Sequence, residues 1–380
     1  MPAASILIKP ASANCNMDCK YCFYKCLSSH REEYSKGFMK EETLETLVRE
    51  AIAYADGSLT FAFQGGEPTL AGLDFFQKAV ELQQKYNNKK LQIENTIQTN
   101  GVLIDEKWAR FLGEHCFLVG LSLDGPKKMH DRYRKDAAGQ DTFGRIMHSV
   151  QLLEQYHVDY NVVTVVTNDT AKQASFLYKF WKRNHYPFVQ FIPCMDEIKR
   201  QDGTQERSIY AVEPEQYGKF LCELFDLWYA DFAEGEAMDI RMFSNLAQMA
   251  AGYPAEECGM NGCCNCYFVV EGDGSVYPCD FYCMDAWKLG TVNDGFVQMK
   301  TSEKAKAFVG ASRPVCAACQ ECPYFSLCRG GCRRWREPFV DGKPGLNQLC
   351  SAYRMFFAHA AERMERLGAY IRRKYAGSGK

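Results

Sequence analysis

The chain has 380 residues, with 45 Lys and Arg against 47 Asp and Glu, so its formal net charge is −2. This balance offers no basic surface for nucleic acid or an anionic membrane, and 47% hydrophobic residues suffice for a substantial core. No apolar run approaches the roughly 20 residues of a membrane span, and the N-terminus lacks the pattern of a signal peptide. We therefore expect a cytoplasmic protein whose 19 cysteines are thiols rather than disulfides.

Short β-rich runs alternate with amphipathic stretches through the first half of the chain. The expected strands are Ser5–Lys9, Leu59–Phe63, Leu91–Gln98, Phe117–Leu123, Tyr160–Val166 and Phe188–Ile192. Apolar residues recur at helical spacing at roughly 40–55, 73–86, 105–113, 142–156 and 171–184. Strands that alternate with helices predict βαβ units and a parallel sheet. Six units are too few for a closed eight-stranded barrel, so we expect an α/β fold with a partial (β/α)6 barrel.

The second half of the chain has a different character. Residues 195–212 are polar without periodicity and indicate a connector, and a helix is expected at about 214–233. From Cys258 to Cys350 the chain carries 12 of its 19 cysteines. Gly272–Gly274 predict the turn of a β-hairpin within this part. A final helix is expected at about 351–374.

Three cysteines form a C-x3-C-x2-C motif in the loop after the first expected strand: Cys15, Cys19 and Cys22. Ordinary electron-transfer clusters have four cysteine ligands. Three thiolates would hold three irons of a [4Fe–4S] cluster and leave the fourth iron open for chemistry, as catalytic zinc keeps an open position. The alternative is a zinc loop, to which Cys26 or His30 would supply the fourth ligand.

Polar, glycine-containing segments follow the next three expected strands: QGGEP at 64–68, QTNG at 98–101 and SLDG at 122–125. The carboxyl ends of parallel strands lie at one edge of a sheet, where α/β proteins place their sites. Glycines there let the backbone approach a ligand closely. Taken singly, each segment is equally well explained as a turn.

The cysteine triplet, with Tyr21 at the aromatic position before its last cysteine, resembles the signature of the radical S-adenosylmethionine (SAM) superfamily. The resemblance implies that the open iron binds SAM and that reduction of the cluster yields a 5′-deoxyadenosyl radical, which abstracts a substrate hydrogen. It also implies SAM-binding residues in the three segments, with Ser122 as candidate for the SAM carboxylate and Arg134 or Arg145 as helpers. The expected set is Gly65, Gly66, Glu67, Gln98, Asn100, Ser122, Asp124 and Arg134.

The cysteine series of the second half resembles the SPASM domain, which carries two auxiliary [4Fe–4S] clusters. The resemblance implies a radical SAM domain over 1–235, a SPASM domain over 236–380 and two interleaved ligand sets. The first set is Cys258, Cys264, Cys279 and Cys332, and the second is Cys319, Cys322, Cys328 and Cys350. Spacing favours Cys264 over the adjacent Cys263. Eight cysteines remain unassigned: Cys26, Cys116, Cys194, Cys222, Cys263, Cys266, Cys283 and Cys316.

Segments spread over nearly the whole chain resemble anaerobic sulfatase-maturating enzymes: IKPASANCNMDCKYCFY, FAFQGGEPTLAG, QTNG, CGMNG, VYPCDFY and CRGGCRRWRE. The resemblance implies oxidation of a Cys or Ser to Cα-formylglycine in a C/S-x-P/A-x-R-type sequence of an unfolded or nascent sulfatase. It implies three [4Fe–4S] clusters, SAM and an external one-electron reductant such as flavodoxin or ferredoxin. Asp280 would be the catalytic base, and Tyr24 and Gln64 would bind the substrate side chain.

Three other functions would explain part of this pattern. A peptide-modifying enzyme that forms thioether or carbon–carbon crosslinks would keep the architecture, but such enzymes often carry an N-terminal recognition domain, and only about 14 residues precede Cys15. A radical activase does not account for the second cysteine region. A zinc-stabilised binding module leaves the triplet and GGEP unexplained, and iron and acid-labile sulfide analysis separates it from an iron–sulfur enzyme.

Overall fold

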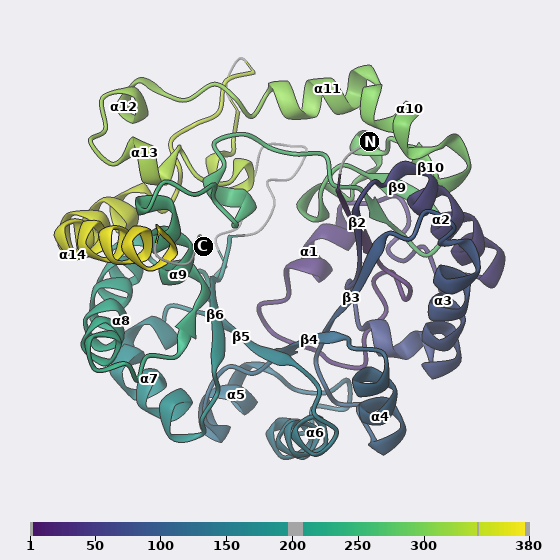
Figure 1. Ribbon diagram of the computed structural model, residues 1–380, viewed down its shortest axis with the longest axis horizontal. Helices are drawn as coiled ribbons and strands as arrows, with labels where there is room; N and C mark the ends of the chain where they lie inside the picture. Colours follow the sequence, from purple (N-terminus) through teal and green to yellow (C-terminus); the bar gives the residue numbers. More distant parts are fainter. Residues whose placement is uncertain (1–2, 197–207, 340–341, 377–380) are drawn as a thin grey trace. The chain divides into compact units, whose positions relative to one another are not determined.

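The computed structural model describes residues 3–196, 208–339 and 342–376. They form two compact units. The first holds the described part of 1–162 with Asn265–Phe308, and the second holds the described parts of 163–199, 206–264 and 309–380. Each unit therefore combines segments from both halves of the sequence, as the colours in Figure 1 show. Most of the connector expected at 195–212 lies outside the described residues, and the domain boundary at 235/236 stays a prediction.

A mostly parallel sheet forms the centre of the first unit. Its strands are β1 (Ala4–Ile8), β2 (Ser58–Phe63), β3 (Gln92–Thr99), β4 (Leu118–Ser122), β8 (Val269–Val270), β9 (Ser275–Tyr277) and β10 (Gly290–Thr291). They lie in the order β10-β9-β8-β1-β2-β3-β4. β8 pairs parallel with β1, while β9 and β10 continue the sheet antiparallel. Residues that follow β1 and β8 therefore emerge side by side at one edge.

Amphipathic helices cover the strands of the first unit. They are α1 (Phe23–Ser29), α2 (Glu41–Tyr54), α3 (Leu73–Tyr86), α4 (Glu106–Glu114), α5 (Lys127–Tyr133), α6 (Phe143–Gln155) and α10 (Phe296–Thr301), with α11 (Glu303–Gly310) at the boundary of the unit. α2 and α3 lie on one side of β2 and β3, and α1 lies on the other (Figure 1). Local signals set the helix ends. Asp105, for example, caps α4 by accepting from the Trp108 N–H at 2.9 Å.

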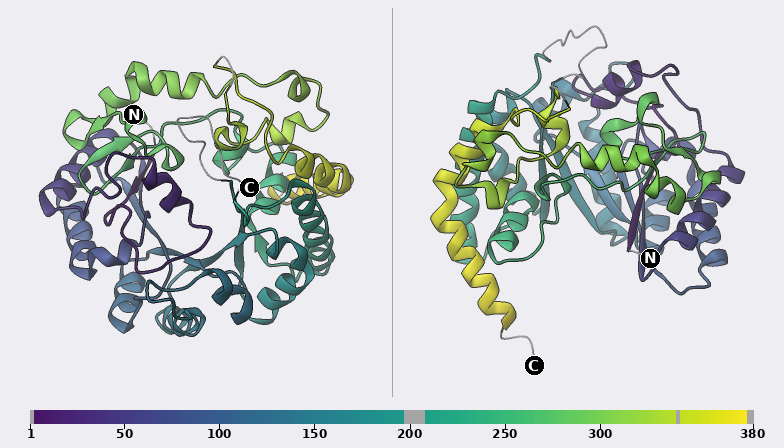
Figure 2. Two further views of the ribbon diagram at one scale, coloured as in Figure 1. Left: turned by 180° about the vertical axis from the view of Figure 1, so that it is seen from behind. Right: turned by 90° about the horizontal axis from the view of Figure 1, so that it is seen from above.

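The second unit contains three strands and a group of long helices. Its elements are β5 (Tyr160–Val166), which begins in the first unit, β6 (Phe188–Pro193), β7 (Asp239–Ile240), α7 (Ala174–Arg183), α8 (Pro214–Glu234), α9 (Arg241–Ala250), α12 (Ala317–Gln320), α13 (Phe325–Cys328) and α14 (Cys350–Ala376). The long helix α14 packs along α8 and α9 (Figures 1 and 2). Gly218 of α8 permits this close approach, since a Cβ there would lie 3.1 Å from the Ala352 Cα. No helix of the described residues combines the length and apolar character that a membrane span requires.

The expected elements are present. All six expected strands agree with β1 to β6 within one residue at each end, and the hairpin at Gly272–Gly274 joins β8 to β9. The helix expected at 214–233 is α8, which begins with Pro214 and ends at the left-handed Gly235. The last expected helix is α14, and the helix expected at 171–184 begins later because a 3-10 turn occupies Thr170–Gln173. The parallel α/β architecture is thus confirmed.

Two glycines let the segment after β2 pass directly behind the cysteine loop. Gly66 donates its N–H to the Ser12 carbonyl at 2.7 Å, and a Cβ on Gly66 would lie 2.1 Å from the Asn14 carbonyl oxygen. Gly65 has a φ of +105°, and its Cβ would lie 2.7 Å from Cγ of Lys9. The chain's own close contacts therefore require glycine at both positions, whatever ligand binds nearby.

Replacing Gly66 with Ala should weaken the fold at the cysteine loop. The new methyl group would force the Asn14 backbone to move, and overpacking of this kind costs about 1–3 kcal/mol. Gly144→Ala is the matched control, because Gly144 lies in α6 with open space around its Cβ, and Ala is the better helix former by about 1 kcal/mol. Anaerobic thermal unfolding should show a lower midpoint for Gly66→Ala only. Equal midpoints would contradict this account.

Candidate active site

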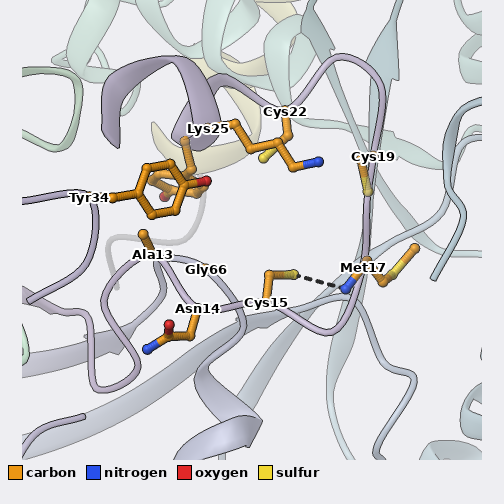
Figure 3. A pocket seen from close by; sticks show the side chains of 10 residues that line it. Ala13, Asn14, Cys15, Met17, Cys19, Cys22, Lys25, Tyr34 and Gly66 are labelled. Atoms are coloured by element: carbon orange, nitrogen blue, oxygen red, sulfur yellow. Dashed lines mark hydrogen bonds between the residues drawn. The ribbon is translucent and has the colours of Figure 1, made fainter. Parts of the chain in front are cut away.

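A cavity of about 250 Å³ opens beside the loop between β1 and α1, lined in part by Tyr24 and Tyr34. Figure 3 shows the sulfur atoms of Cys15, Cys19 and Cys22 around the same space. In the part of the chain that the structure describes, no group of His, Cys, Asp and Glu side chains converges closely enough to hold a single metal ion. The three thiols, spread around a cavity, fit a larger cluster better than one zinc ion.

The electrostatics of the loop also suit an iron–sulfur cluster. Cys15 as a whole residue is exposed, but its thiol is largely surrounded by protein. This loss of solvation, together with the nearby Glu67 carboxylate and the thiols of Cys19 and Cys22, raises the pKa of Cys15 to about 12. Burial likewise raises the pKa of Cys19. Thiolates are thus disfavoured until a cation is bound, and coordination to iron deprotonates a thiol. The residues present therefore fit a three-cysteine [4Fe–4S] site.

Glu67 connects the ends of β2 and β3. Its buried carboxylate accepts from the hydroxyls of Thr69 and Thr99, both at 2.7 Å, and from the Asn100 N–H at 2.7 Å. Burial raises the pKa of Glu67, and these hydrogen bonds oppose the shift. Because the carboxylate is engaged within the protein, the geometry supports a role in fixing the loops. Direct contact of Glu67 with SAM stays a prediction.

The polar side chains after β3 and β4 lie close together. The Gln98 amide donates to the Ser122 hydroxyl at 3.1 Å. The Asn100 amide donates to the side-chain oxygen of Asn16 at 2.8 Å, inside the cysteine motif. The three expected SAM-binding segments and the cysteine loop thus meet at one edge of the sheet within the first unit, as their places after the strands predicted.

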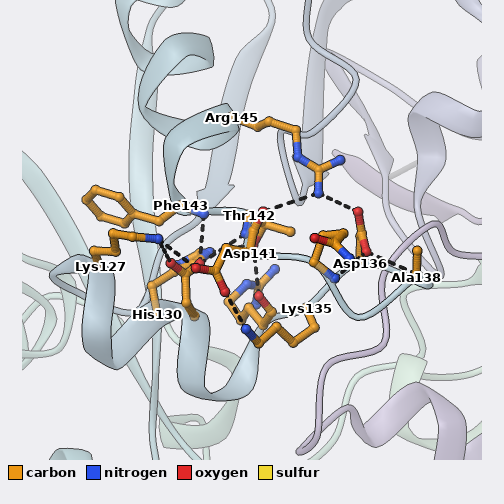
Figure 4. Close-up of polar contacts among 12 residues, drawn as sticks. Lys127, His130, Lys135, Asp136, Ala138, Asp141, Thr142, Phe143 and Arg145 are labelled. Carbon is orange, nitrogen blue, oxygen red and sulfur yellow. Dashed lines mark hydrogen bonds and ion pairs between the residues drawn. The ribbon is translucent and has the colours of Figure 1, made fainter.

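A second polar group lies next to Cys19. The buried Tyr21 hydroxyl donates to the Asp124 carboxylate and accepts from Nη1 of Arg134 at 3.1 Å. Burial and Asp124 raise the pKa of Tyr21, so the phenol stays protonated. Burial disfavours the charge of Arg134, but Cys19, Tyr21 and Asp124 outweigh it and raise its pKa. Arg145 is not part of this group. It pairs with Asp136 at 2.6 Å (Figure 4).

Asp280, Tyr24 and Gln64 form a continuous hydrogen-bonded chain. The Tyr24 hydroxyl donates to Oδ2 of Asp280 at 2.6 Å, and the Gln64 amide donates to the Tyr24 hydroxyl at 2.7 Å. Asp280 follows Cys279 at the start of a 3-10 turn. Tyr24 also lines the cavity of the three thiols. The structure therefore brings together the three residues that the sequence associated with the substrate.

Sequence reasoning missed the charged residues behind Asp280. The Lys9 ammonium lies 2.9 Å from Oδ1 of Asp280 and 3.5 Å from Oε1 of Glu271, which Arg31 also contacts at 2.7 Å. Burial alone would lower the pKa of Lys9, but Asp280, Cys283 and Glu271 raise it, so Lys9 stays protonated. The sequence does carry a signal, since Lys9 and Glu271 each directly follow a buried apolar strand.

The auxiliary-cluster cysteines of the second unit also approach one another. Burial and the thiols of Cys264 and Cys258 raise the pKa of Cys332 to about 11. The Cys264 N–H donates to the Ser312 hydroxyl at 2.7 Å, whereas Cys263 is exposed. The three thiols fit part of a cluster site, and its completion by Cys279 of the first unit stays a prediction.

The second expected ligand set lies entirely in the second unit. Cys319 lies within α12 and Cys322 follows this helix, while Cys328 is the last residue of α13 and Cys350 is the first residue of α14. Burial, a contact with Cys316 and the thiols of Cys350 and Cys328 raise the pKa of Cys319 to about 12. The Cys316 thiol contacts the Cys319 sulfur at 3.6 Å, and a shared cluster for the four expected ligands stays a prediction.

A buried histidine supports the Asp124 loop. His130 accepts the Asp124 N–H at Nδ1 over 3.3 Å, and its Nε2 lies 3.0 Å from the Thr142 hydroxyl (Figure 4). The Thr142 hydroxyl donates to the Arg134 carbonyl, which leaves the proton of the imidazole on Nε2. Burial, together with Arg134 and Lys127, holds the pKa of His130 well below 6.5. The neutral imidazole is therefore part of the folded site.

Comparisons with known proteins cover almost the entire chain. The radical SAM superfamily model matches residues 10–179, and the SPASM iron–sulfur cluster-binding domain matches 262–323. A cysteine-type anaerobic sulfatase-maturating enzyme of Clostridium perfringens is 47% identical, over 96% of this chain and 98% of the relative. A serine-type enzyme of Bacteroides thetaiotaomicron is 34% identical, over 95% of this chain and 90% of the relative.

Solved structures agree. Native anSMEcpe with bound AdoMet and the Cp18Cys peptide matches with a TM-score of 0.92 and 45% identity, over 97% of this chain and 100% of that chain. Streptococcus suis SuiB bound to its precursor peptide SuiA matches with a TM-score of 0.61 and 16% identity, over 92% of this chain and 76% of that chain. The second likeness is one of fold alone.

Stability should depend on pH through His130. The pKa of His130 is depressed in the folded state, so folding requires a neutral imidazole. Below about pH 6.5 the unfolded chain binds a proton at His130 that folding must release, which lowers the free energy of unfolding by up to about 1.4 kcal/mol per pH unit. Above this pH the effect is absent. The stability advantage of the natural protein over His130→Gln should therefore shrink between pH 7.5 and 5.5, as measured by thermal midpoints. A difference independent of pH would contradict the neutral assignment.

Proposed function

Because this chain belongs to the anaerobic sulfatase-maturating enzymes, radical SAM proteins with a SPASM domain, we propose that it oxidises a sulfatase cysteine to Cα-formylglycine. One observation carries the proposal beyond the family. Tyr24 lines the cavity of the three thiols and donates to Asp280 at 2.6 Å, so a proton acceptor lies one residue from the radical site.

SAM and iron–sulfur clusters are the cofactors of this radical SAM and SPASM architecture. We propose three [4Fe–4S] clusters, held by the triplet and by the two auxiliary sets named above. The SAM-binding residues are proposed to be those of the GGEP, QTNG and SLDG segments with Arg134. A cytoplasmic location, an unfolded or nascent form of the sulfatase and a flavodoxin or ferredoxin as reductant also belong to this proposal.

Asp280 is the proposed base, and its neighbours Tyr24 and Lys9 are hydrogen-bond donors. When bound, the cofactors supply a 5′-deoxyadenosyl radical and, in the auxiliary clusters, an acceptor for a second electron. Burial and Asp280 raise the pKa of Tyr24 well above its usual range, so Tyr24 keeps its proton and acts as a donor. The protonated Lys9 likewise donates. Of these groups, only the Asp280 carboxylate is suited to take the substrate proton.

The atoms and electrons of the proposed reaction balance as follows. The substrate cysteine loses one hydrogen atom from Cβ, one proton from sulfur to Asp280, and one electron, which leaves a thioaldehyde. Water then replaces the sulfur, giving the aldehyde and hydrogen sulfide. Gln64 and Tyr24 are the proposed substrate-binding residues, because their hydrogen-bonded chain ends at Asp280.

We propose cysteine rather than serine as the residue oxidised. The cysteine-type relatives from Clostridium perfringens and Clostridium novyi share 47% and 44% identity with this chain. The serine-type relatives from Bacteroides thetaiotaomicron and Klebsiella pneumoniae share 34% and 31%. A paired assay of Cys-x-Pro-x-Arg and Ser-x-Pro-x-Arg peptides reports this preference directly.

Asp280→Asn should separate SAM cleavage from product formation. The amide keeps the shape of the side chain but cannot accept the proton, and general-base catalysis contributes about 10²–10⁴-fold. With SAM, dithionite and a Cys-x-Pro-x-Arg peptide, mass spectrometry should detect 5′-deoxyadenosine but at least about 100-fold less formylglycine. Asp285→Asn is the control, because that carboxylate accepts from the Glu32 N–H away from Tyr24.

Three results would revise the proposal. Full formylglycine yield from Asp280→Asn would remove Asp280 as the base. Loss of product in Asp285→Asn as well would point to a general effect on the fold. A crosslinked peptide from the natural protein, in place of an aldehyde, would favour the peptide-crosslinking alternative.

A further inference from the structure

A fifth thiol lies beside one of the four that are proposed to bind the second auxiliary cluster. The fifth belongs to Cys316, and its sulfur lies 3.6 Å from that of Cys319. The chain reads C-x2-C-x2-C from Cys316 through Cys319 to Cys322, and all three residues are half-buried. A [4Fe–4S] cluster binds four protein thiolates, so one sulfur exceeds what the cluster requires.

The backbone holds Cys316 and Cys319 on the same side of a tight turn. Cys316 is the N-cap of α12, with extended backbone angles of φ −70° and ψ 160°. Its carbonyl accepts the Cys319 N–H at 2.9 Å, and the Cys319 carbonyl accepts the Cys322 N–H at 3.3 Å. Two successive turns thus present the cysteines in order, and the cap places Cys316 next to Cys319.

The separation of the two sulfurs is informative. With metal–sulfur bonds of about 2.3 Å, two sulfurs on one tetrahedral metal are about 3.8 Å apart. The thiolates on different irons of a cubane point away from one another and lie much farther apart. The Cys316 thiol donates to the Cys319 sulfur at 3.6 Å, a separation at which either sulfur could reach the same iron. Each iron of the cubane accepts one thiolate besides its three sulfides, so only one of the two cysteines can bind at a time.

The contact between the two sulfurs brings Cys316 within reach of the same centre as the proposed ligand Cys319.

We propose that Cys316 is an alternative ligand of the second auxiliary cluster, competing with Cys319 for one iron. This inference depends on the cluster site of the proposed function. Exchange of the two ligands transfers one proton from the Cys316 sulfur to the Cys319 sulfur and changes no oxidation state. The consequence is a cluster that survives the loss of Cys319. Among the described residues, no second thiol makes a comparable contact with the sulfur of Cys322.

The iron and sulfide content of cysteine variants tests directly whether Cys316 can replace Cys319. Full-length natural protein, Cys316→Ala, Cys319→Ala, the double variant and Cys322→Ala are reconstituted anaerobically, and iron and acid-labile sulfide are determined per chain. We expect Cys316→Ala and Cys319→Ala to keep the full content. The double variant and Cys322→Ala should each lose about four irons and four sulfides, the content of one [4Fe–4S] cluster. Electron paramagnetic resonance of the reduced samples identifies the cluster that is lost.

The outcomes separate the inference from the proposed function. If Cys319→Ala loses as much iron as Cys322→Ala, or if the double variant keeps its iron, Cys316 is not an alternative ligand. Circular dichroism checks that each variant is folded, and Cys319→Ser repeats the test with a more conservative change. Natural protein without iron and sulfide would instead overturn the cluster sites of the proposed function.

Discussion

The Lys9 ammonium, buried at the end of β1 between two carboxylates, is the interaction on which the substrate side of the site depends. It lies 2.9 Å from Asp280 and 3.5 Å from Glu271, and Lys9 is 1% exposed. Removing one partner from a buried ion pair costs about 3–5 kcal/mol, since the other charge is left unpaired. Parallel pairing of β1 with β8 sets Lys9 beside Glu271, so sheet register and charge pairing reinforce each other.

This pairing supports the proposed role of Asp280. Lys9 and Tyr24 both hold their protons and both contact Asp280, so the carboxylate is the proposed acceptor among these three groups. Tyr24 in turn reaches the cavity where the three thiols of the cysteine loop meet. The arrangement connects the proposed base to the cavity of the three thiols through Tyr24.

Local patterns in the sequence predicted the strands, the helices and the polar segments after the strands, because periodicity and turn residues act over a few positions. They could not predict that Lys9 pairs with Asp280, since that contact joins residues 271 positions apart in the chain and needs the register of β1 with β8. The sequence predicts that Gly66 lets a ligand approach the backbone. In the structure, position 66 must be glycine because a Cβ there would collide with the Asn14 backbone. Spacing left Cys316 unassigned, and the proposal that it is an alternative ligand depends on its distance to Cys319, which the sequence does not give.

The most direct test of the account follows a single hydrogen atom. The reconstituted enzyme is given SAM, dithionite and a Cys-x-Pro-x-Arg peptide whose cysteine carries deuterium at both Cβ positions. The account predicts one deuterium in 5′-deoxyadenosine and a formylglycine that retains the other. Formylglycine without deuterium transfer would contradict abstraction from Cβ, and so would 5′-deoxyadenosine that carries only solvent hydrogen while the peptide is oxidised.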